Sequence, residues 1–199
     1  DTMAAIFENS EQLSRISIER ITAEWLRIID SPTPMQGMFL LQKLGLLELF
    51  IPEFTPTIGC QQGGAHAYDV FEHLLRSLQA AADKNFSTEM RLAALFHDIG
   101  KPATRRTGGK NKTYSFYGHE VVGAKMTAHI LKRLKMPRDF SDTVVTLVRW
   151  HMFFADPDEI TLSAVRRTIA RVGEERIEDL LDLRVCDRIG TGRPKEQPF

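Results

Sequence analysis

RLAALFHDIGKP, at residues 91–102, is the stretch of sequence that decides the fold. Its apolar residues recur at helical spacing, and Ser87 stands where the N-cap of such a helix belongs. Gly100 ends the helical pattern, so the pair His97–Asp98 is predicted to lie where the helix stops. One short step of backbone then brings a neutral nitrogen donor and an anionic oxygen donor to the same place.

Helical periodicity continues on both sides of this stretch, and no segment keeps the strict alternation of a half-buried strand. We therefore predict an all-α fold. The segment from Thr104 to Tyr114 has no apolar anchor and is predicted to be a mobile surface loop. Helices are expected over residues 18–30, 34–45, 69–82, 88–100, 119–135, 139–150, 163–171 and 174–189, with a short turn of helix over 46–50.

Composition narrows the class of protein. The 26 Lys and Arg residues balance 26 Asp and Glu residues, so no global basic field indicates nucleic-acid binding. Cys60 and Cys186 lack CxxC spacing, which disfavours a disulfide framework or a zinc ribbon and favours a reducing, cytoplasmic setting. The sequence contains no apolar run long enough to predict a membrane-spanning segment. The opening Asp1-Thr2-Met3 does not look like a natural start, which leaves open that the sequence is one piece of a longer polypeptide.

Six histidine and aspartate residues carry the chemistry. One buried histidine alone is more often a hydrogen-bonded core residue than a ligand, but the set points to a metal centre. Imidazole nitrogens with carboxylate oxygens suit one or two divalent ions such as Mn, Ni, Fe, Mg or Zn. An aspartate can bridge two ions that together clamp a phosphoryl oxygen and activate water, which predicts phosphoester hydrolysis. The six residues are His73, His97, Asp98, His119, His151 and Asp187.

The order His73, His97–Asp98, Asp187 resembles the H...HD...D signature of the HD superfamily, and RLAALFHDIGKP looks like its central motif. Four further stretches sharpen the resemblance: YDVFEHLLRSLQAA (68–81), FYGHEVVGA (116–124), LVRWHMF (147–153) and AVRRTIARVGEERIEDLLDLRVCDRIGTGRPK (164–195). Together they look like the C-terminal part of the bacterial CCA-adding tRNA nucleotidyltransferase and poly(A) polymerase family. ISIERITAEWLRII (16–29) and GMFLLQKLGLLELFIPEF (37–54) are similar to the helical RNA-binding segment of that family.

This resemblance implies an HD-domain helical bundle at 65–190, preceded by a small RNA-binding helical segment at 1–55 and followed by a tail at 191–199. It implies that His73, His97, Asp98 and Asp187 bind a first ion. His119 and His151 match the histidines that hold a second ion in two-metal HD phosphodiesterases, together with a bridging aspartate. The resemblance implies that Asp98 is this bridging, catalytic residue. The nucleotidyltransferase head that the family needs has no counterpart in this sequence, so the chain alone is not expected to add nucleotides.

The roles of several residues near the motif have two interpretations. Lys101 is either a catalytic, phosphate-binding ammonium or a solvated cation at a helix end. Arg105 belongs to a basic run, with Arg106, Lys110 and Lys112, that either attracts a substrate phosphate or is simply solvated. His66 and Asp69 could orient a metal-binding histidine by accepting a hydrogen bond from its other ring nitrogen. Asp69 is equally well explained as a helix N-cap.

Three functions remain open from the sequence. The first is a metal-dependent phosphohydrolase acting on nucleotide or RNA-end phosphoesters, with tRNA as a candidate partner. The second is a non-catalytic RNA- and metal-binding module that supports a CCA-adding or poly(A) polymerase head. The third is a regulatory domain that senses a nucleotide through an inactive HD site.

Overall fold

A computed structural model describes residues 2–63, 66–108, 113–154 and 161–192. Helices account for nearly all the regular structure of these ranges, which confirms the predicted all-α class. None of the helices in the described ranges combines the length and the apolar character that spanning a membrane requires. The predicted residues 193–199 of the tail, and Lys110 and Lys112, lie outside what the structure describes.

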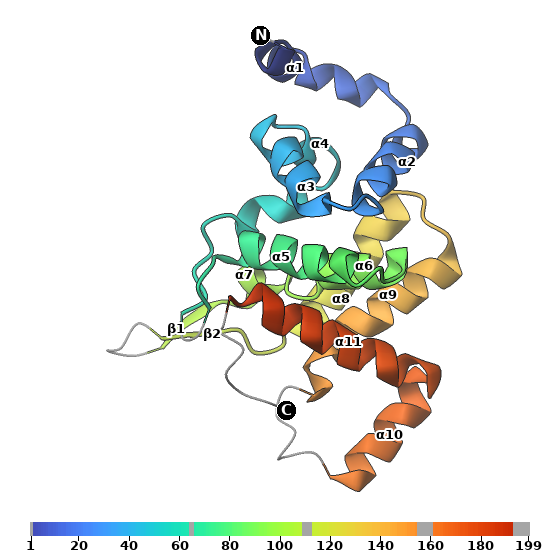
Figure 1. The fold of residues 1–199 in the computed structure, drawn as a ribbon. Coiled ribbons are helices and arrows are strands. Elements are labelled where there is room, and N and C mark those ends of the chain that lie inside the picture. Colours follow the sequence, from blue (N-terminus) through green and yellow to red (C-terminus); the bar gives the residue numbers. More distant parts are fainter. Residues whose placement is uncertain (1, 64–65, 109–112, 155–160, 193–199) are drawn as a thin grey trace.

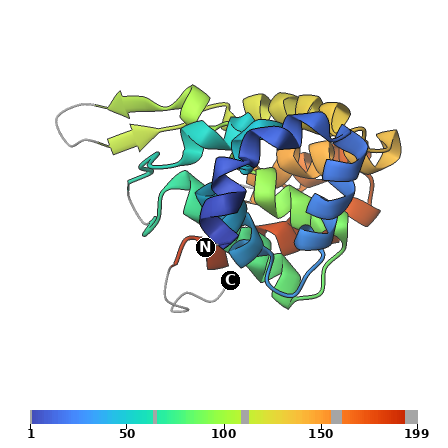
Figure 2. The ribbon, with the colours of Figure 1, turned by 90° about the horizontal axis from the view of Figure 1, so that it is seen from above.

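The N-terminal segment lies at one end of the molecule, above the central helices in Figure 1 and across them in Figure 2. The helices α2 and α3 begin where the sequence predicts, whereas the two helices before them, over residues 2–15, were not predicted. The elements are α1 (Thr2–Glu8), the 3-10 helix η1 (Ser10–Arg15), α2 (Ile18–Ile29), α3 (Pro34–Lys43), α4 (Leu47–Phe50) and the 3-10 helix η2 (Pro52–Thr57).

The remaining helices form a bundle around α5 and α6, with α8 and α9 packed together behind them and α11 crossing α5 (Figure 1). The side chains of Asp69 and Ser87 accept hydrogen bonds from the backbone N–H groups of Glu72 and Met90, which confirms both predicted N-caps. The elements are α5 (Val70–Asp83), α6 (Thr88–Phe96), α7 (Lys101–Thr104), α8 (His119–Arg133), α9 (Arg138–Trp150), the 3-10 helix η3 (His151–Phe154), α10 (Leu162–Val172) and α11 (Glu175–Gly190).

The N-terminal segment and the bundle share one hydrophobic core. The ring centroids of Trp25 of α2 and Phe96 lie 6.3 Å apart. Phe54 of η2 stacks on Phe96, with ring centroids 5.7 Å apart. Buried polar contacts add to this packing, since Arg91 of α6 donates to the carbonyl of Ile29 at 2.9 Å. The helix α6, which leads into the central motif, is therefore held in place by contacts with the N-terminal segment.

The loop predicted between Thr104 and Tyr114 is wrong for most of its described residues. Strands β1 (Arg106–Gly108) and β2 (Thr113–Ser115) pair antiparallel, with Thr107 opposite Tyr114. The hairpin projects from the side of the bundle in both views (Figures 1 and 2). Backbone pairing holds it rather than an apolar face, so the periodicity of the sequence carries no signal for it.

Candidate metal centre

The six predicted ligands come from five different places in the bundle and meet in its interior. His73 lies in the first turn of α5, and His97 and Asp98 follow directly on the end of α6. His119 is the first residue of α8, while His151 follows α9 and Asp187 lies in the last turn of α11. All six are buried. They form two groups that share Asp98, and the potential ligand atoms within each group lie within 4.8 Å of one another.

The first group surrounds Oδ2 of Asp98. The Nε2 atom of His73 lies 3.2 Å from this oxygen, and the Nε2 atom of His97 lies 3.3 Å from it. Oδ1 of Asp187 lies 3.3 Å from Nε2 of His73 and 3.6 Å from Nε2 of His97. Two imidazoles and two carboxylates thus converge on one point.

The second group surrounds the other oxygen of the same carboxylate. Oδ1 of Asp98 lies 3.1 Å from Nε2 of His119 and 3.5 Å from Nε2 of His151. Each oxygen of Asp98 therefore faces a separate pair of histidines, which is the arrangement that a carboxylate bridging two cations needs.

Backbone carbonyls fix the tautomers of three of the histidines. Nδ1 of His97, His119 and His151 lies 2.8, 2.8 and 2.7 Å from the carbonyl oxygen three residues earlier in the chain. A carbonyl only accepts, so each Nδ1 carries the proton, and Nε2 of the neutral ring presents a lone pair to the centre. This is how a metal-binding imidazole is normally held.

Close contacts between ring nitrogens fit a centre that holds a cation. Nε2 of His73 and Nε2 of His97 lie 3.0 Å apart, and the Nε2 atoms of His119 and His151 lie 3.2 Å apart. Two neutral nitrogen lone pairs repel at such a distance unless a proton or a metal ion lies between them. The nitrogen and oxygen donors, without a thiolate, suit borderline and hard divalent ions.

The pKa values of the ligand residues in the metal-free chain also indicate that the carboxylates favour a nearby positive charge. Burial would lower the pKa of His97, but the carboxylates of Asp98 and Asp187 raise it to about 10. Burial would raise the pKa of Asp98, yet the Lys101 ammonium and the charge on His97 hold it well below its usual range. The pKa of His151, in contrast, is lowered, with burial as the largest cause. Both carboxylates of the centre, and the raised histidine pKa that they cause, thus lie in the first group.

Lys101 is not the solvated cation of the alternative reading, because only 7% of it is exposed. Its ammonium lies 2.5 Å from Oδ2 of Asp98 and donates to Oε1 of Gln62 at 2.6 Å. Gln62, itself buried, was not identified from the sequence because it lies 39 residues away and matches no motif. A desolvated ammonium beside the shared carboxylate is well placed for a phosphoryl oxygen.

Arg105 lies at the surface, between α7 and the hairpin. Its guanidinium stacks 3.9 Å from the ring centroid of Tyr114. The structure therefore attaches Arg105 to the hairpin rather than to the ligands, and its contact with a substrate phosphate stays a prediction.

His66 and Asp69 have separate roles. Asp69 is the N-cap of α5, and its second carboxylate oxygen accepts from the backbone N–H of Gly59 at 2.6 Å. The ring of His66 packs edge-on against that of His73, with centroids 5.3 Å apart. Burial lowers the pKa of His66 to about 4, and the neighbouring charge of Lys101 acts in the same direction.

Close backbone approach at two glycines brings the groups together. A Cβ at Gly100 would lie 2.3 Å from the carbonyl oxygen of His119 and 2.6 Å from the backbone nitrogen of Gly123. A Cβ at Gly190 would lie 2.2 Å from the hydroxyl of Ser77 and 2.9 Å from the carbonyl oxygen of His73. The sequence offered only the small residues themselves as a signal, and Gly100 was interpreted as a helix end.

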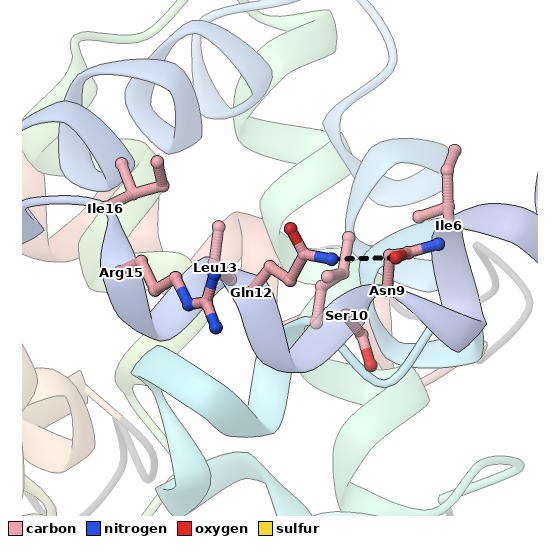
Figure 3. A pocket seen from close by; sticks show the side chains of 8 residues that line it. Ile6, Asn9, Ser10, Gln12, Leu13, Arg15 and Ile16 are labelled. Carbon is pink, nitrogen blue, oxygen red and sulfur yellow. Dashed lines mark hydrogen bonds between the residues drawn. The ribbon is translucent and has the colours of Figure 1, made fainter.

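Two apolar hollows lie in the N-terminal segment, away from the histidines. One, of about 400 Å³, lies along η1 and is lined by side chains that include Ile6, Leu13 and Ile16 (Figure 3). The other, of about 300 Å³, lies between η1, α2 and the segment from α3 to α4, and Trp25 and Phe50 contribute to its lining. Neither contains a ligand-type cluster, so the metal centre is the candidate site for chemistry.

Comparison with known proteins agrees with this architecture. The HD domain family matches residues 70–192, and the family described as a probable RNA and SrmB-binding site of polymerase A matches residues 1–58. An A-adding tRNA nucleotidyltransferase of Deinococcus radiodurans is 37% identical over 172 residues, which cover 85% of this chain and 39% of that protein.

Two further relatives give the same picture. A CC-adding tRNA nucleotidyltransferase of Thermus thermophilus is 37% identical over 175 residues, which cover 87% of this chain and 39% of that protein. A multifunctional CCA protein of Neisseria gonorrhoeae is 26% identical over 203 residues, covering 99% of this chain and 48% of that protein. The chain thus spans less than half the length of these relatives. Its match over residues 70–192 places the chain in the HD domain family.

Proposed function

We propose that this chain is a divalent-metal-dependent phosphohydrolase that acts on phosphoesters of nucleotides or RNA ends. The observation that carries the proposal is the carboxylate of Asp98, whose two oxygens lie 3.1–3.5 Å from the Nε2 atoms of two separate histidine pairs. A single-ion structural site would need only the first group. The second group supports a centre built for two ions.

In this proposal the first ion is held by His73, His97, Asp98 and Asp187, and the second by Asp98, His119 and His151. Ions bound there would supply Lewis-acid activation of the phosphoryl group and of the attacking water. The donor set is compatible with Mn, Ni, Fe, Mg or Zn.

The side chains around the ligands would bind and orient the substrate. The ammonium of Lys101, desolvated beside Asp98, would pair with a non-bridging oxygen of the phosphate and leave its contact with Gln62. Arg105, carried on the ring of Tyr114, would meet a phosphate farther from the reacting bond. Asp98 stays ionised because of Lys101, so it can hold positive charge on both sides.

A second candidate function is a non-catalytic module of a tRNA-processing protein. The match of residues 1–58 to an RNA-binding family and the names of the relatives favour it. In that case residues 1–55 would contact tRNA, residues 65–190 would be the HD domain, and a nucleotidyltransferase head elsewhere in the protein would perform the chemistry. Both functions can also coexist in one protein.

Metal content and hydrolysis, measured together, separate the two candidates. Metal bound to the purified chain is quantified by mass spectrometry, and hydrolysis of bis(p-nitrophenyl) phosphate and of 2',3'-cyclic AMP is followed with added Mn²⁺ or Ni²⁺. We expect stoichiometric metal and turnover that His97→Ala abolishes. Equal rates for the wild type and His97→Ala would contradict the phosphohydrolase. Salt-dependent tRNA binding that survives chelation, without turnover, would favour the module.

A further inference from the structure

The chain has a fifth histidine at the metal centre, outside the ligand set of the H...HD...D pattern. Of its six histidines, only His129, an exposed residue on α8, lies apart from the cluster. His66 contacts the ring of His73, and the charges of Lys101, Asp98 and Asp187 all act on it. It therefore lies near Lys101 and both carboxylates of the first half of the centre, yet it belongs to neither set of ligand atoms.

The residual exposure of the ligands shows from which side the centre is open. The side chains of Asp187, Lys101 and His119 are 12%, 9% and 8% exposed, whereas those of His73, His97, Asp98 and His151 are between 0% and 3% exposed. His66 is half-buried, and its neighbours Lys101 and Asp187 belong to the three side chains with the larger exposed fractions. His66 thus lies beside the more exposed side chains of the centre.

The position of His66 is fixed by contacts on both sides of it. Its backbone N–H donates to the carbonyl of Gly63 at 3.3 Å, and the N–H of Ala67 donates to the carbonyl of Thr191 at 3.3 Å. Gln62, on the same segment, bonds the ammonium of Lys101. Two described residues near His66 in the sequence therefore have fixed contacts, Gln62 with Lys101 and Ala67 with the end of α11.

The hydrogen-bonding capacity of one ring nitrogen of His66 is unused among the described residues. Its Nδ1 atom is buried and has no hydrogen-bond partner in the part of the chain that the structure describes. Buried polar atoms are nearly always paired in folded proteins, and the exceptions often mark functional sites. An imidazole carries at least one N–H in either protonation state, so the ring can always donate to an oxyanion.

We propose that His66 is a substrate-binding residue, whose ring N–H donates a hydrogen bond to a non-bridging oxygen of the phosphoester bound beside Asp98 and Lys101. The inference rests on the proposed function for its substrate, and on the contacts above for its place. A role in packing alone predicts that any flat ring at position 66 would serve equally well.

The test uses two substitutions of His66 and a matched control in the Mn²⁺-loaded chain. His66→Phe keeps a ring against His73 but removes both nitrogens, His66→Gln restores a donor without the ring, and His129→Ala removes a histidine outside the centre. Binding of inorganic phosphate is measured by calorimetry, metal content by mass spectrometry, and kcat and KM with bis(p-nitrophenyl) phosphate.

We expect His66→Phe to retain the metal of the wild type while it weakens phosphate binding at least tenfold and lowers kcat/KM about 100-fold, the usual loss for one donor to a developing oxyanion. His66→Gln should recover part of both, and His129→Ala should match the wild type.

The inference is overturned if His66→Phe binds phosphate as tightly as the wild type, or if it loses metal in proportion to its loss of phosphate. The second result would make His66 a support for His73. A wild type that binds phosphate but does not hydrolyse contradicts the proposed enzyme and leaves the binding comparison decisive for His66. A wild type that does neither contradicts both.

Discussion

The two halves of the metal centre share a carboxylate but differ in what else they contain. The first half, around Oδ2 of Asp98, adds a second carboxylate from Asp187 and the ammonium of Lys101. The second half, around Oδ1, adds only two imidazoles, each with its Nδ1 proton on a backbone carbonyl. One more protein donor, the carboxylate of Asp187, predicts that the first half binds its ion more tightly.

This difference teaches how one fold can hold a resident ion and an exchangeable one. A site with four protein ligands keeps its ion through purification, whereas a site with three leaves room for water and substrate. The four predictions that follow test this division, beginning with the substitution that removes both halves.

Asp98→Ala should have the largest effect because it removes the only atom pair common to both groups. We expect loss of both ions and a fall in turnover of about 1,000-fold or more. Metal analysis and hydrolysis of bis(p-nitrophenyl) phosphate measure it. Asp142→Ala is the matched control, since Asp142 pairs with Arg138 at 3.7 Å on the surface. A variant that keeps either ion stoichiometrically would contradict the shared role of Asp98.

Substitutions confined to one half should separate the two ions. His151→Ala should leave one tightly bound ion and lower turnover roughly 100-fold, a loss of the size that disturbed metal sites show. His73→Ala should cost the resident ion itself. Metal remaining after dialysis distinguishes them. Identical stoichiometry in the two variants would mean that the halves do not differ as their ligands suggest.

Gly100→Ala should damage the junction between the halves. Its Cβ would meet the carbonyl oxygen of His119 at 2.3 Å, and backbone on both sides has little freedom to move away. We expect a loss of about 1–3 kcal/mol in the free energy of unfolding, the usual cost of overpacking. Chemical denaturation of the metal-free chain measures it.

Gly123→Ala is the control for this junction, because its Cβ would meet its nearest neighbours at 3.4–3.7 Å, an ordinary contact. Within a helix, alanine is favoured over glycine by up to about 1 kcal/mol, so this variant should be neutral or slightly more stable. If both variants unfold alike, the contact between Gly100 and α8 is not the limiting one.

The pH dependence of metal binding should give the smallest effect and the finest comparison. In the first half the pKa of His97 is raised to about 10, so an incoming ion must displace a proton at neutral pH. Its affinity should rise about tenfold per pH unit between pH 7 and pH 8.5. In the second half the pKa of His151 is lowered, so that ring needs no deprotonation above pH 7.

Calorimetric titration of His151→Ala and His73→Ala with Mn²⁺ at several pH values separates the two slopes. A flat profile for the first half would show that its histidines are neutral before the ion binds.

The sequence predicted what depends on local pattern. The helices that carry His73, His97 and His119 follow from apolar periodicity and from the caps Asp69 and Ser87, and both caps are present. The gathering of the six ligand residues came from the family resemblance rather than from periodicity, and their role as ligands is still a prediction. Helical patterns fix which residues share a face, but they do not fix which helices meet.

What the sequence did not predict depends on contacts between distant segments. The burial of Lys101 requires Gln62, and the role of Gly100 requires the start of α8. The hairpin at 106–108 and 113–115 is built from backbone pairing of polar residues, and the helices at residues 2–15 bury no residue fully. None of these features leaves a periodic trace in the amino-acid order.

The carbonyls that accept from His97, His119 and His151 each stand three residues earlier in the chain. The direction in which each of these rings presents its lone pair is therefore set within one turn of backbone, before any long-range folding. Drift in the surrounding helices can change the spacing of the donors but cannot invert their polarity. Such a centre should lose affinity by degrees as its scaffold diverges.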